Sequence, residues 1–191
     1  MEISYIGIDP GRTGAAVMLS GSGKLVAIAG WKPVRRNKRD RYSIVSWKWR
    51  GGEESPWCEN RLVPLRAGAV GKYLADIFST KSLKAEVACE DSYIGKNPRS
   101  GLAVARFSGG VVAPVEELFS VQSEWVLPGE WRASILGIRR NTKRAAAKQA
   151  SLRYIPARIP RLSDALLKIG IADHYTDAAG VAEWLRTKPK R

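Results

Sequence analysis

Short runs of apolar residues, each closed by turn-forming residues, open the chain. Residues 3 to 9 form the first run, which Pro10 and Gly11 end, and residues 15 to 19 form the second. A third run, residues 24 to 31, follows the turn sequence Ser-Gly-Ser-Gly. Apolar runs of this length between turns are typical of β-strands, and strands joined by short turns pair antiparallel. This part of the chain therefore predicts a three-stranded antiparallel meander.

Helical periodicity begins further along the chain. One face of residues 67 to 80 carries apolar side chains at helical spacing, which predicts an amphipathic helix: Val70, Tyr73, Leu74, Ile77 and Phe78. Residues 85 to 90 then predict a buried strand, residues 98 to 113 a helix rich in Ala and Gly, residues 121 to 127 another strand, and residues 174 to 187 a last helix with one apolar face. We therefore expect an α/β fold in which strands come first.

The regular pattern is lost between residues 32 and 66. Basic residues alternate there with tryptophans that lie in or beside the segment: Trp31, Trp47, Trp49 and Trp57. Because 191 residues suit one domain, we expect a single domain over residues 1–191 with a basic, Trp-rich insertion at about 32–66. Three interpretations of the insertion stand side by side: a hairpin whose tryptophans stack on bases, a small hydrophobic cluster holding a solvated loop, and a dimer contact.

The charge of the chain favours a polyanionic partner. Lys and Arg total 32 against 18 acidic residues, a net charge of +14. Residues 132 to 162 contain no Asp or Glu and many Arg and Lys, so they predict a cationic surface. Nucleic acid is the expected partner, although charge alone also fits a ribosomal or simply basic protein.

The cysteines and the apolar runs of the sequence indicate the cellular location to expect. Cys58 and Cys89 stand alone without CxxC spacing, so neither a zinc knuckle nor a disulfide framework is expected, and a reducing cytoplasm fits. The first residues lack the pattern of a signal peptide. Every apolar run is interrupted well before the roughly 18 residues that a membrane span needs. We expect a cytoplasmic protein with no membrane partner and no small-molecule cofactor.

Two carboxylates end predicted strands. Asp9 closes the first strand and Glu90 closes the strand over 85 to 90. A carboxylate at such a position is costly to bury unless it is paired, protonated or bound to a cation. Asp9 in the sequence Asp-Pro-Gly is also good turn chemistry, and Asp91 beside Glu90 is expected to be a cap or a solvated neighbour. Neither carboxylate by itself establishes a functional site.

A histidine and an aspartate open the last helix. His174 and Asp177 are three positions apart, so they lie on one helical face and can hold one ion. His174 is the single histidine of the chain, which excludes sites that need two, such as HExxH and Cys2His2. Asp173 is expected to be the helix N-cap.

Together these residues suit phosphodiester hydrolysis. Three carboxylates and an imidazole from separated segments make a plausible site for two divalent ions, which would lie about 3.5 to 4 Å apart. Oxygen ligands suit Mg²⁺ or Mn²⁺, and the imidazole shifts the preference toward Mn²⁺. No covalent nucleophile is required.

The motifs resemble those of the RuvC Holliday junction resolvases, within the RNase H-like nucleases. The sequence Gly-Ile-Asp-Pro-Gly-Arg-Thr-Gly over residues 7 to 14 is similar to that family's first catalytic motif, and Glu90 with residues 93 to 100 to the second. Residues 100 to 112 resemble the helix that follows, and Asp177-Ala-Ala-Gly-Val-Ala the third motif. The likeness covers residues 1 to 31 and 85 to 187. It implies an RNase H-like mixed sheet, with the antiparallel meander joined by parallel strands and flanked by helices.

The resemblance also implies roles and partners. Asp9, Glu90, His174 and Asp177 become the metal ligands and catalytic residues of a crossover junction endodeoxyribonuclease. The enzyme would be a homodimer that nicks opposed strands of a four-way DNA junction, in bacterial recombination and repair or on replicated phage DNA. Residues matched to DNA contacts, or lying in the basic stretch, are Tyr93, Lys96, Arg139, Arg140, Lys143, Arg144 and Lys148.

The sequence differs from the family pattern in two places, and two other functions remain as alternatives. The insertion at 32–66 is longer than expected for the family. Asp164 imitates the third motif but has Arg161 three residues before it, so Asp177 is preferred. The glycine-rich start also resembles the phosphate loop of actin-like ATPases and sugar kinases, although a second phosphate loop is absent. A non-catalytic protein that binds branched DNA is the remaining alternative.

Overall fold

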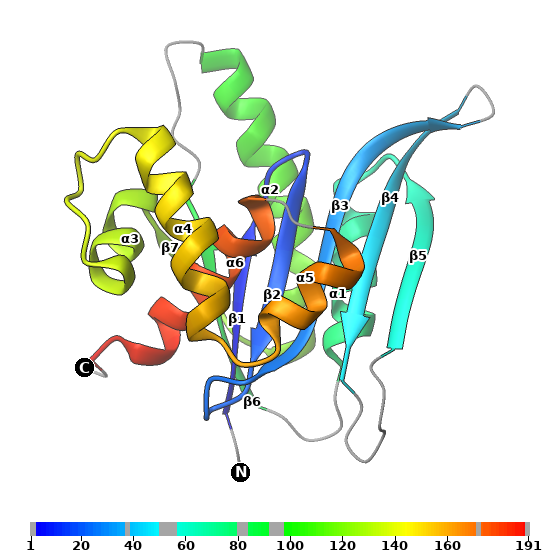
Figure 1. The fold of residues 1–191 in the computed structure, drawn as a ribbon. Helices are drawn as coiled ribbons and strands as arrows, with labels where there is room; N and C mark the ends of the chain where they lie inside the picture. Colours follow the sequence, from blue (N-terminus) through cyan, green and yellow to red (C-terminus); the bar gives the residue numbers. More distant parts are fainter. Residues whose placement is uncertain are drawn as a thin grey trace.

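A mixed sheet forms the centre of the molecule in the computed structural model (Figure 1). The structure describes residues 3–36, 39–49, 57–79, 84–91, 98–170 and 173–189. Within these ranges seven strands are ordered β5-β4-β3-β2-β1-β6-β7. Tyr93 and Lys96, two of the predicted DNA contacts, lie outside the described residues.

The predicted meander is confirmed. β1 (Ile3–Asp9) pairs antiparallel with β2 (Gly14–Leu19), and β2 pairs antiparallel with β3 (Leu25–Arg36). All the side chains of β2 are buried. The centre of the sheet therefore lies where the apolar runs of the sequence are most continuous.

The segment from 32 to 66 extends this sheet. β3 continues to Arg36, and β4 (Arg39–Lys48) and β5 (Trp57–Pro64) add two more antiparallel strands. β3 and β4 form a long hairpin that curves away from the body of the molecule (Figure 1). The hairpin of one of the three interpretations is present. Buried and half-buried side chains alternate along much of β4, a pattern that suits a sheet with one face more fully covered.

The tryptophans of this segment belong largely to the core. Trp31 and Trp47 are 2% and 1% exposed, so the interpretation that they stack on exposed bases is wrong for both. Trp49 packs against the same cluster as Trp47 and lies under the guanidinium of Arg161, 4.0 Å from the ring centre. The side chain of Trp57 is outside the described part of the chain. The three described side chains do not form the small separate cluster of the second interpretation, because Trp31 belongs to the main core on one face of the sheet and Trp47 and Trp49 to the core on the other.

Two parallel strands complete the sheet. β6 (Lys84–Glu90) pairs parallel with β1, and β7 (Glu124–Val126) pairs parallel with β6. β7 is shorter than the strand predicted over 121 to 127. The backbone N–H of Val121 instead bonds to the carbonyl of Glu116, and both the N–H and the hydroxyl of Ser123 bond to the Glu116 carboxylate. These residues therefore close the preceding helix before the strand can begin.

Helices cover both faces of the sheet (Figure 1). One face carries α1 (Ala67–Phe78) and α2 (Pro98–Phe119), and the other carries α3 (Pro128–Leu136), α4 (Arg144–Arg158), α5 (Leu162–Ile169) and α6 (Asp173–Thr187). α2 continues past its predicted end at 113, and α3 to α5 lie in basic sequence that predicts no element. Among the described helices, none is both long and apolar enough to cross a bilayer.

Candidate active site

The ends of two parallel neighbours bring Asp9 and Glu90 to the same edge of the sheet. Ile8 of β1 lies in register with Cys89 of β6, and each strand ends at its next residue, Asp9 or Glu90. Parallel strands end on the same side, so both carboxylates emerge together. Their side chains are only 19% and 14% exposed. The strand-end carboxylates predicted from sequence are therefore neighbours in space.

α6 reaches this edge because glycines let it approach closely. A Cβ atom on Gly7 of β1 would lie 2.2 Å from the carbonyl oxygen of Ala178 and 2.3 Å from the backbone nitrogen of Ala182. A Cβ on Gly180 would lie 2.3 Å from the ring of Trp131. A side chain at Gly7 would push α6 away from β1, and a side chain at Gly180 would force α6 and α3 apart. Gly7 thus sets how near the start of α6 comes to Asp9.

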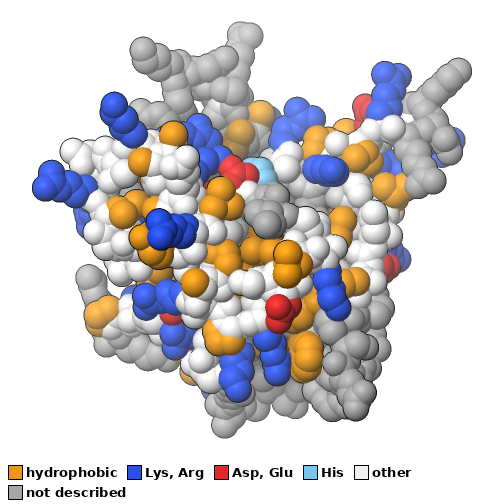
Figure 2. All heavy atoms as spheres, in the orientation of Figure 1, with side chains coloured by type: hydrophobic (Ala, Val, Ile, Leu, Met, Phe, Trp, Pro, Cys, Tyr) orange, Lys and Arg blue, Asp and Glu red, His pale blue; other side chains and the backbone are white. Residues whose placement is uncertain are grey.

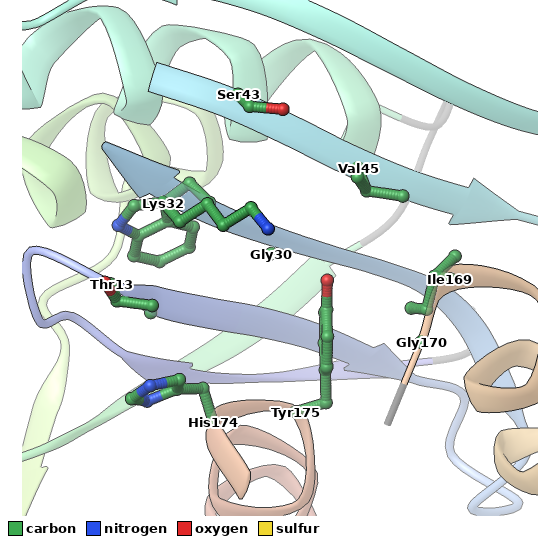
Figure 3. A pocket seen from close by; sticks show the side chains of 11 residues that line it. Thr13, Gly30, Lys32, Ser43, Val45, Ile169, Gly170, His174 and Tyr175 are labelled. Atoms are coloured by element: carbon green, nitrogen blue, oxygen red, sulfur yellow. The ribbon is translucent and has the colours of Figure 1, made fainter. Parts of the chain in front are cut away.

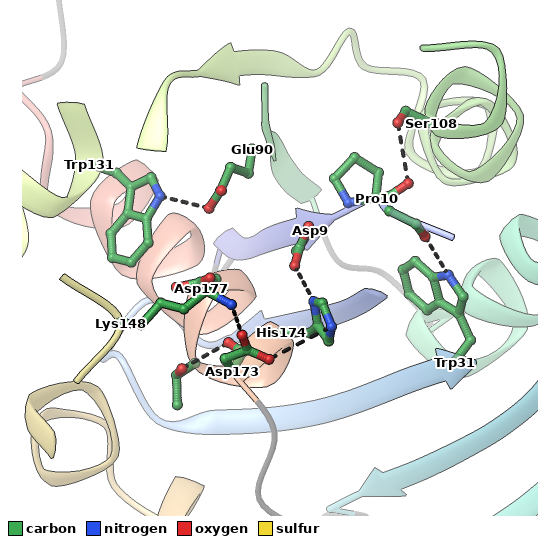
Figure 4. Close-up of polar contacts among 12 residues, drawn as sticks. Asp9, Pro10, Trp31, Glu90, Ser108, Trp131, Lys148, Asp173, His174 and Asp177 are labelled. Carbon is green, nitrogen blue, oxygen red and sulfur yellow. Dashed lines mark hydrogen bonds and ion pairs between the residues drawn. The ribbon is translucent and has the colours of Figure 1, made fainter. Parts of the chain in front are cut away.

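The turn after Asp9 is fixed from both sides (Figure 4). The indole N–H of Trp31 donates to the carbonyl of Gly11 at 2.9 Å, and the hydroxyl of Ser108 donates to the carbonyl of Pro10 at 3.2 Å. These bonds come from β3 and from α2. They hold the Asp-Pro-Gly turn as part of the site rather than as a free loop.

His174 is paired with Asp9. Its Nδ1 atom lies 2.8 Å from Asp9 Oδ2, and this hydrogen bond is the main reason that the pKa of His174 is raised, with burial opposing the shift. Its Nε2 atom lies 3.7 Å from Asp173 Oδ1, and Asp173 is also ion-paired with Lys148 of α4 (Figure 4). Asp173 is the first residue of α6, where its carboxylate contacts these two side chains.

Glu90 and Asp177 share a cation from α3. Arg132 Nη2 lies 3.0 Å from Asp177 Oδ1 and 3.9 Å from Glu90 Oε1. The adjacent Trp131 donates its indole N–H to Glu90 Oε2 at 2.9 Å (Figure 4), and the Arg132 guanidinium lies over the Trp131 ring. Asp177 Oδ1 is buried and faces this guanidinium in an ion pair that lacks the alignment of a hydrogen bond.

The carboxylates repel one another. Burial, followed by the charges of Asp177 and Asp9, raises the pKa of Glu90 to about 8 despite Arg132. Burial likewise raises the pKa of Asp177, and Arg132 opposes that shift. Both shifts arise first from burial, so these carboxyl groups are costly to ionise in the metal-free site, and a bound cation would offset that cost.

A cavity of about 530 Å³, which we call the catalytic cavity, joins these groups. It is lined by the predicted ligands and by basic side chains of α3 and α4, together with Asp91, Pro128 and the β1–β2 turn: Asp9, Gly11, Thr13, Glu90, Asp91, Pro128, Arg132, Arg144, Lys148, His174 and Asp177. All four predicted ligands therefore face one space. No three of the described carboxylate, imidazole or thiol groups form a ready-made metal-binding cluster, and Arg132 stands between two of the acids. The donor types nevertheless fit a divalent cation.

The described residues among the predicted DNA contacts lie in or near this cavity. Arg139, Arg140 and Lys143 are exposed in the loop between α3 and α4, and Arg144 and Lys148 line the catalytic cavity itself. A smaller hollow of about 170 Å³ beside it is lined by Arg132, Arg139, Arg140 and Arg144, among others. Lys and Arg side chains are prominent over this face, with acidic and imidazole atoms visible between them (Figure 2).

Sequence reasoning missed Trp131 and Arg132 as parts of the site. Arg132 begins the stretch that predicts a cationic surface, Trp131 directly precedes it, and no spacing relates either residue to Glu90 or Asp177. Arg132 is 9% exposed, whereas a basic stretch suggests solvated side chains. The rejected Asp164 lies exposed on α5, in a separate hollow with Trp47 and Trp49. The geometry thus gives Asp164 no part in the catalytic cavity.

Comparison with known proteins bears on the fold. No family model and no curated protein sequence matches the chain. A structure of Thermus thermophilus RuvC in complex with a Holliday junction substrate superposes with a TM-score of 0.52 and 14% identity, over 96% of this chain and 92% of that one. The chain has the RuvC fold. A second Thermus thermophilus RuvC structure gives a TM-score of 0.50 and 13% identity over the same shares, and the RNase H-like α/β architecture predicted from sequence is confirmed.

Proposed function

We propose that this protein is a divalent-metal-dependent endonuclease that resolves four-way DNA junctions by nicking opposed strands. One observation carries the proposal: Asp9, Glu90, His174 and Asp177, from three separate elements, line a single cavity with basic side chains at its edge. The RuvC fold supports it, since one structure of that fold was determined with a Holliday junction. An acidic centre inside a basic surface suits a phosphodiester held by cations and cut by a metal-activated water.

The proposed ligands are Asp9, Glu90, His174 and Asp177, and Mg²⁺ or Mn²⁺ suits them. Bound there, two such ions would supply an activated water and charge stabilisation for the leaving oxygen. Binding also requires that His174 be neutral, since ligands bind metals in deprotonated form.

The remaining residues of the catalytic cavity position the substrate. Arg144 and Lys148 line the cavity from α4, where they can bind the phosphates on either side of the cut. Arg132 and Trp131 hold the Glu90 and Asp177 carboxylates in place. The exposed Arg139, Arg140 and Lys143 extend the basic surface along the DNA. Paired nicks need two active sites, so a homodimer is part of the proposal.

Cleavage of synthetic DNA tests the function directly. Wild-type protein with Mn²⁺ or Mg²⁺ should cut a four-way junction by paired nicks and leave linear duplex intact. Asp9→Asn should abolish cutting while retaining junction binding, and Asp164→Asn, which changes an exposed carboxylate outside the catalytic cavity, should cut normally. Junction affinity should fall by orders of magnitude between about 50 and 200 mM salt.

The same assay separates the alternatives. A wild-type protein that binds junctions but cuts none with either ion would be a non-catalytic binder of branched DNA. ATP hydrolysis without nuclease activity would indicate an actin-like or sugar-kinase-type phosphotransferase. Equal loss of cutting in Asp164→Asn and Asp9→Asn would remove the special role proposed for the catalytic cavity.

A further inference from the structure

A second cavity opens beside the catalytic cavity. This side pocket, of about 230 Å³, lies between the β2–β3–β4 surface and the junction of α5 with α6, and it is lined by Thr13, Gly14, Gly30, Trp31, Lys32, Ser43, Val45, Ile169, Gly170, His174 and Tyr175 (Figure 3). Thr13 and His174 line both cavities. A group in the side pocket therefore lies against His174, one of the proposed metal ligands.

Tyr175 gives the side pocket its depth. Its ring lies directly over Gly30, where a Cβ atom would approach the Tyr175 hydroxyl to 2.3 Å. Any other residue at position 30 would displace the ring, so the glycine and the tyrosine are matched. Figure 3 shows the hydroxyl directed up into the pocket rather than toward α6.

The Tyr175 hydroxyl is also unused. The residue is 8% exposed, and burial is the cause of its raised pKa. No described residue forms a hydrogen bond with the Tyr175 hydroxyl. The hydroxyl of Ser43, also in the lining, donates to Asn60. Tyr175 Oη is not one of the fully buried side-chain atoms that lack a partner, so it can be reached from the pocket and is available to hydrogen-bond a ligand with a polar edge.

The rest of the lining defines the chemistry of that ligand. Val45 and Ile169 form apolar walls, and the Lys32 amine points into the opening (Figure 3). None of the described lining residues is acidic. Apolar walls with a few placed polar groups suit a flat ring with hydrogen-bonding edges, and an exposed amine suits the phosphate attached to it. A single nucleotide has both features.

We propose that the side pocket binds the base of one nucleotide next to the scissile phosphate, with Tyr175 contacting the edge of the base and Lys32 the adjoining phosphate. This inference rests on the proposed nuclease function, because the catalytic cavity then holds the phosphate. It assigns to the side pocket a role in choosing where the strand is cut. The base must leave its stack to enter, which costs a few kcal/mol in duplex but less at a junction, where stacking is already interrupted.

Binding experiments with abasic DNA test the proposal without cleavage. The Asp9→Asn protein is titrated with four-way junctions that each lack one base, at positions on either side of the expected nick. One position should weaken binding by about five-fold or more, the loss expected for one base contact. The other positions should change affinity little.

Two variants in the Asp9→Asn background connect that position with the side pocket. Val45→Trp fills the cavity, so the intact and abasic junctions should bind equally. Leu118→Trp makes a similar change at an exposed position of α2 and should keep the difference. Tyr175→Phe preserves the shape and removes the hydroxyl, so the abasic effect should persist while the preference among the four bases narrows by about two- to ten-fold.

The outcomes are distinct. A Val45→Trp protein that still discriminates at the same position, or an abasic scan without any sensitive position, overturns the proposal. A change of oligomeric state on Val45→Trp, seen by light scattering, would show that the pocket receives a second copy instead and also overturns it. If Val45→Trp does not fold, unchanged base preference in Tyr175→Phe is decisive against the pocket. If the wild-type protein cuts no junction, the proposed function is refuted. The binding experiments use no cleavage, so they test the side pocket separately.

Discussion

Arg132 and Asp177 form a buried ion pair at 3.0 Å in which the carboxylate oxygen still lacks an aligned hydrogen bond. The guanidinium also lies 3.9 Å from Glu90 and over the ring of Trp131. Arg132 therefore supplies part of the positive charge that two repelling acids require. A divalent ion on Asp177 and Glu90 would have to compete with this arginine.

Replacing Arg132 should separate stability from metal affinity. Arg132→Met keeps much of the side-chain volume but leaves Glu90 and Asp177 without their cation, so the metal-free protein should lose about 3 to 5 kcal/mol. The same variant should bind Mn²⁺ more tightly, because no internal cation competes. Calorimetric titration with Mn²⁺ and thermal melting in EDTA measure the two effects.

Arg144→Met is the matched control for this prediction. Arg144 lines the same cavity but is exposed, so its loss should lower DNA affinity with little effect on stability. Weaker Mn²⁺ binding in Arg132→Met would mean that the arginine orients the ligands rather than competing with the ion.

The stability of the metal-free protein should decrease as pH rises. The pKa of Glu90 is raised from an ordinary value of 4.5 to about 8, so the folded state retains a proton that the unfolded chain has released. Stability from this group is complete below pH 4.5 and is lost as pH rises through about 8. Melting curves in EDTA should therefore show Glu90→Gln gaining stability over wild type at pH 9 and little at pH 5.

Glu117→Gln provides the comparison, since Glu117 is exposed on α2. It should follow the wild-type curve at every pH. Parallel pH profiles for Glu90→Gln and wild type would argue against a strongly raised pKa at Glu90.

The cleavage rate should fall at acidic pH, and the Mn²⁺ concentration should shift the pH at which it falls. The hydrogen bond to Asp9 raises the pKa of His174 above 6.5, and a protonated imidazole cannot bind a metal. At low Mn²⁺ the cutting rate should fall as pH drops through a value above 6.5, and saturating Mn²⁺ should move that point lower. Rates measured against pH at two Mn²⁺ concentrations test this, and a rate that rises steadily toward pH 5.5 would contradict His174 as a ligand.

The buried tryptophans should matter for stability and not for DNA. Trp47 is 1% exposed and its indole N–H has no hydrogen bond from the described residues, so Trp47→Ala should cost about 3 to 5 kcal/mol. Trp47→Phe should cost much less, because no hydrogen bond is lost. Urea denaturation measures both, and a marked loss of junction affinity in folded Trp47→Phe would restore the base-stacking interpretation.

The order of the site residues was predictable from sequence because each lies at a boundary. Asp9 and Glu90 follow apolar runs, and His174 and Asp177 share a helical spacing, so local patterns place them on strand ends and a helix start. That these boundaries meet follows from the parallel pairing of β1 and β6 and from Gly7, whose lack of a side chain has meaning only once α6 lies against it.

Long-range partners were not predictable. Trp131 and Arg132 contact Glu90 and Asp177 across 41 and 45 residues of chain, and neither has a spacing that links it to them. The prediction that Trp31 and Trp47 stack on exposed bases failed for a related reason. Tryptophans beside arginines suggest stacking on bases, but alternation along β3 and β4 turns these two side chains toward the helices.

The site also has a consequence for biosynthesis. Asp9 is translated well before His174 and Asp177, which follow with α6, and α6 must then pack against Gly7 of β1. A nascent chain that has not yet delivered α6 holds two of the four proposed ligands. Such a chain should have no nuclease activity during synthesis, and a fragment truncated before α6 should not cut DNA.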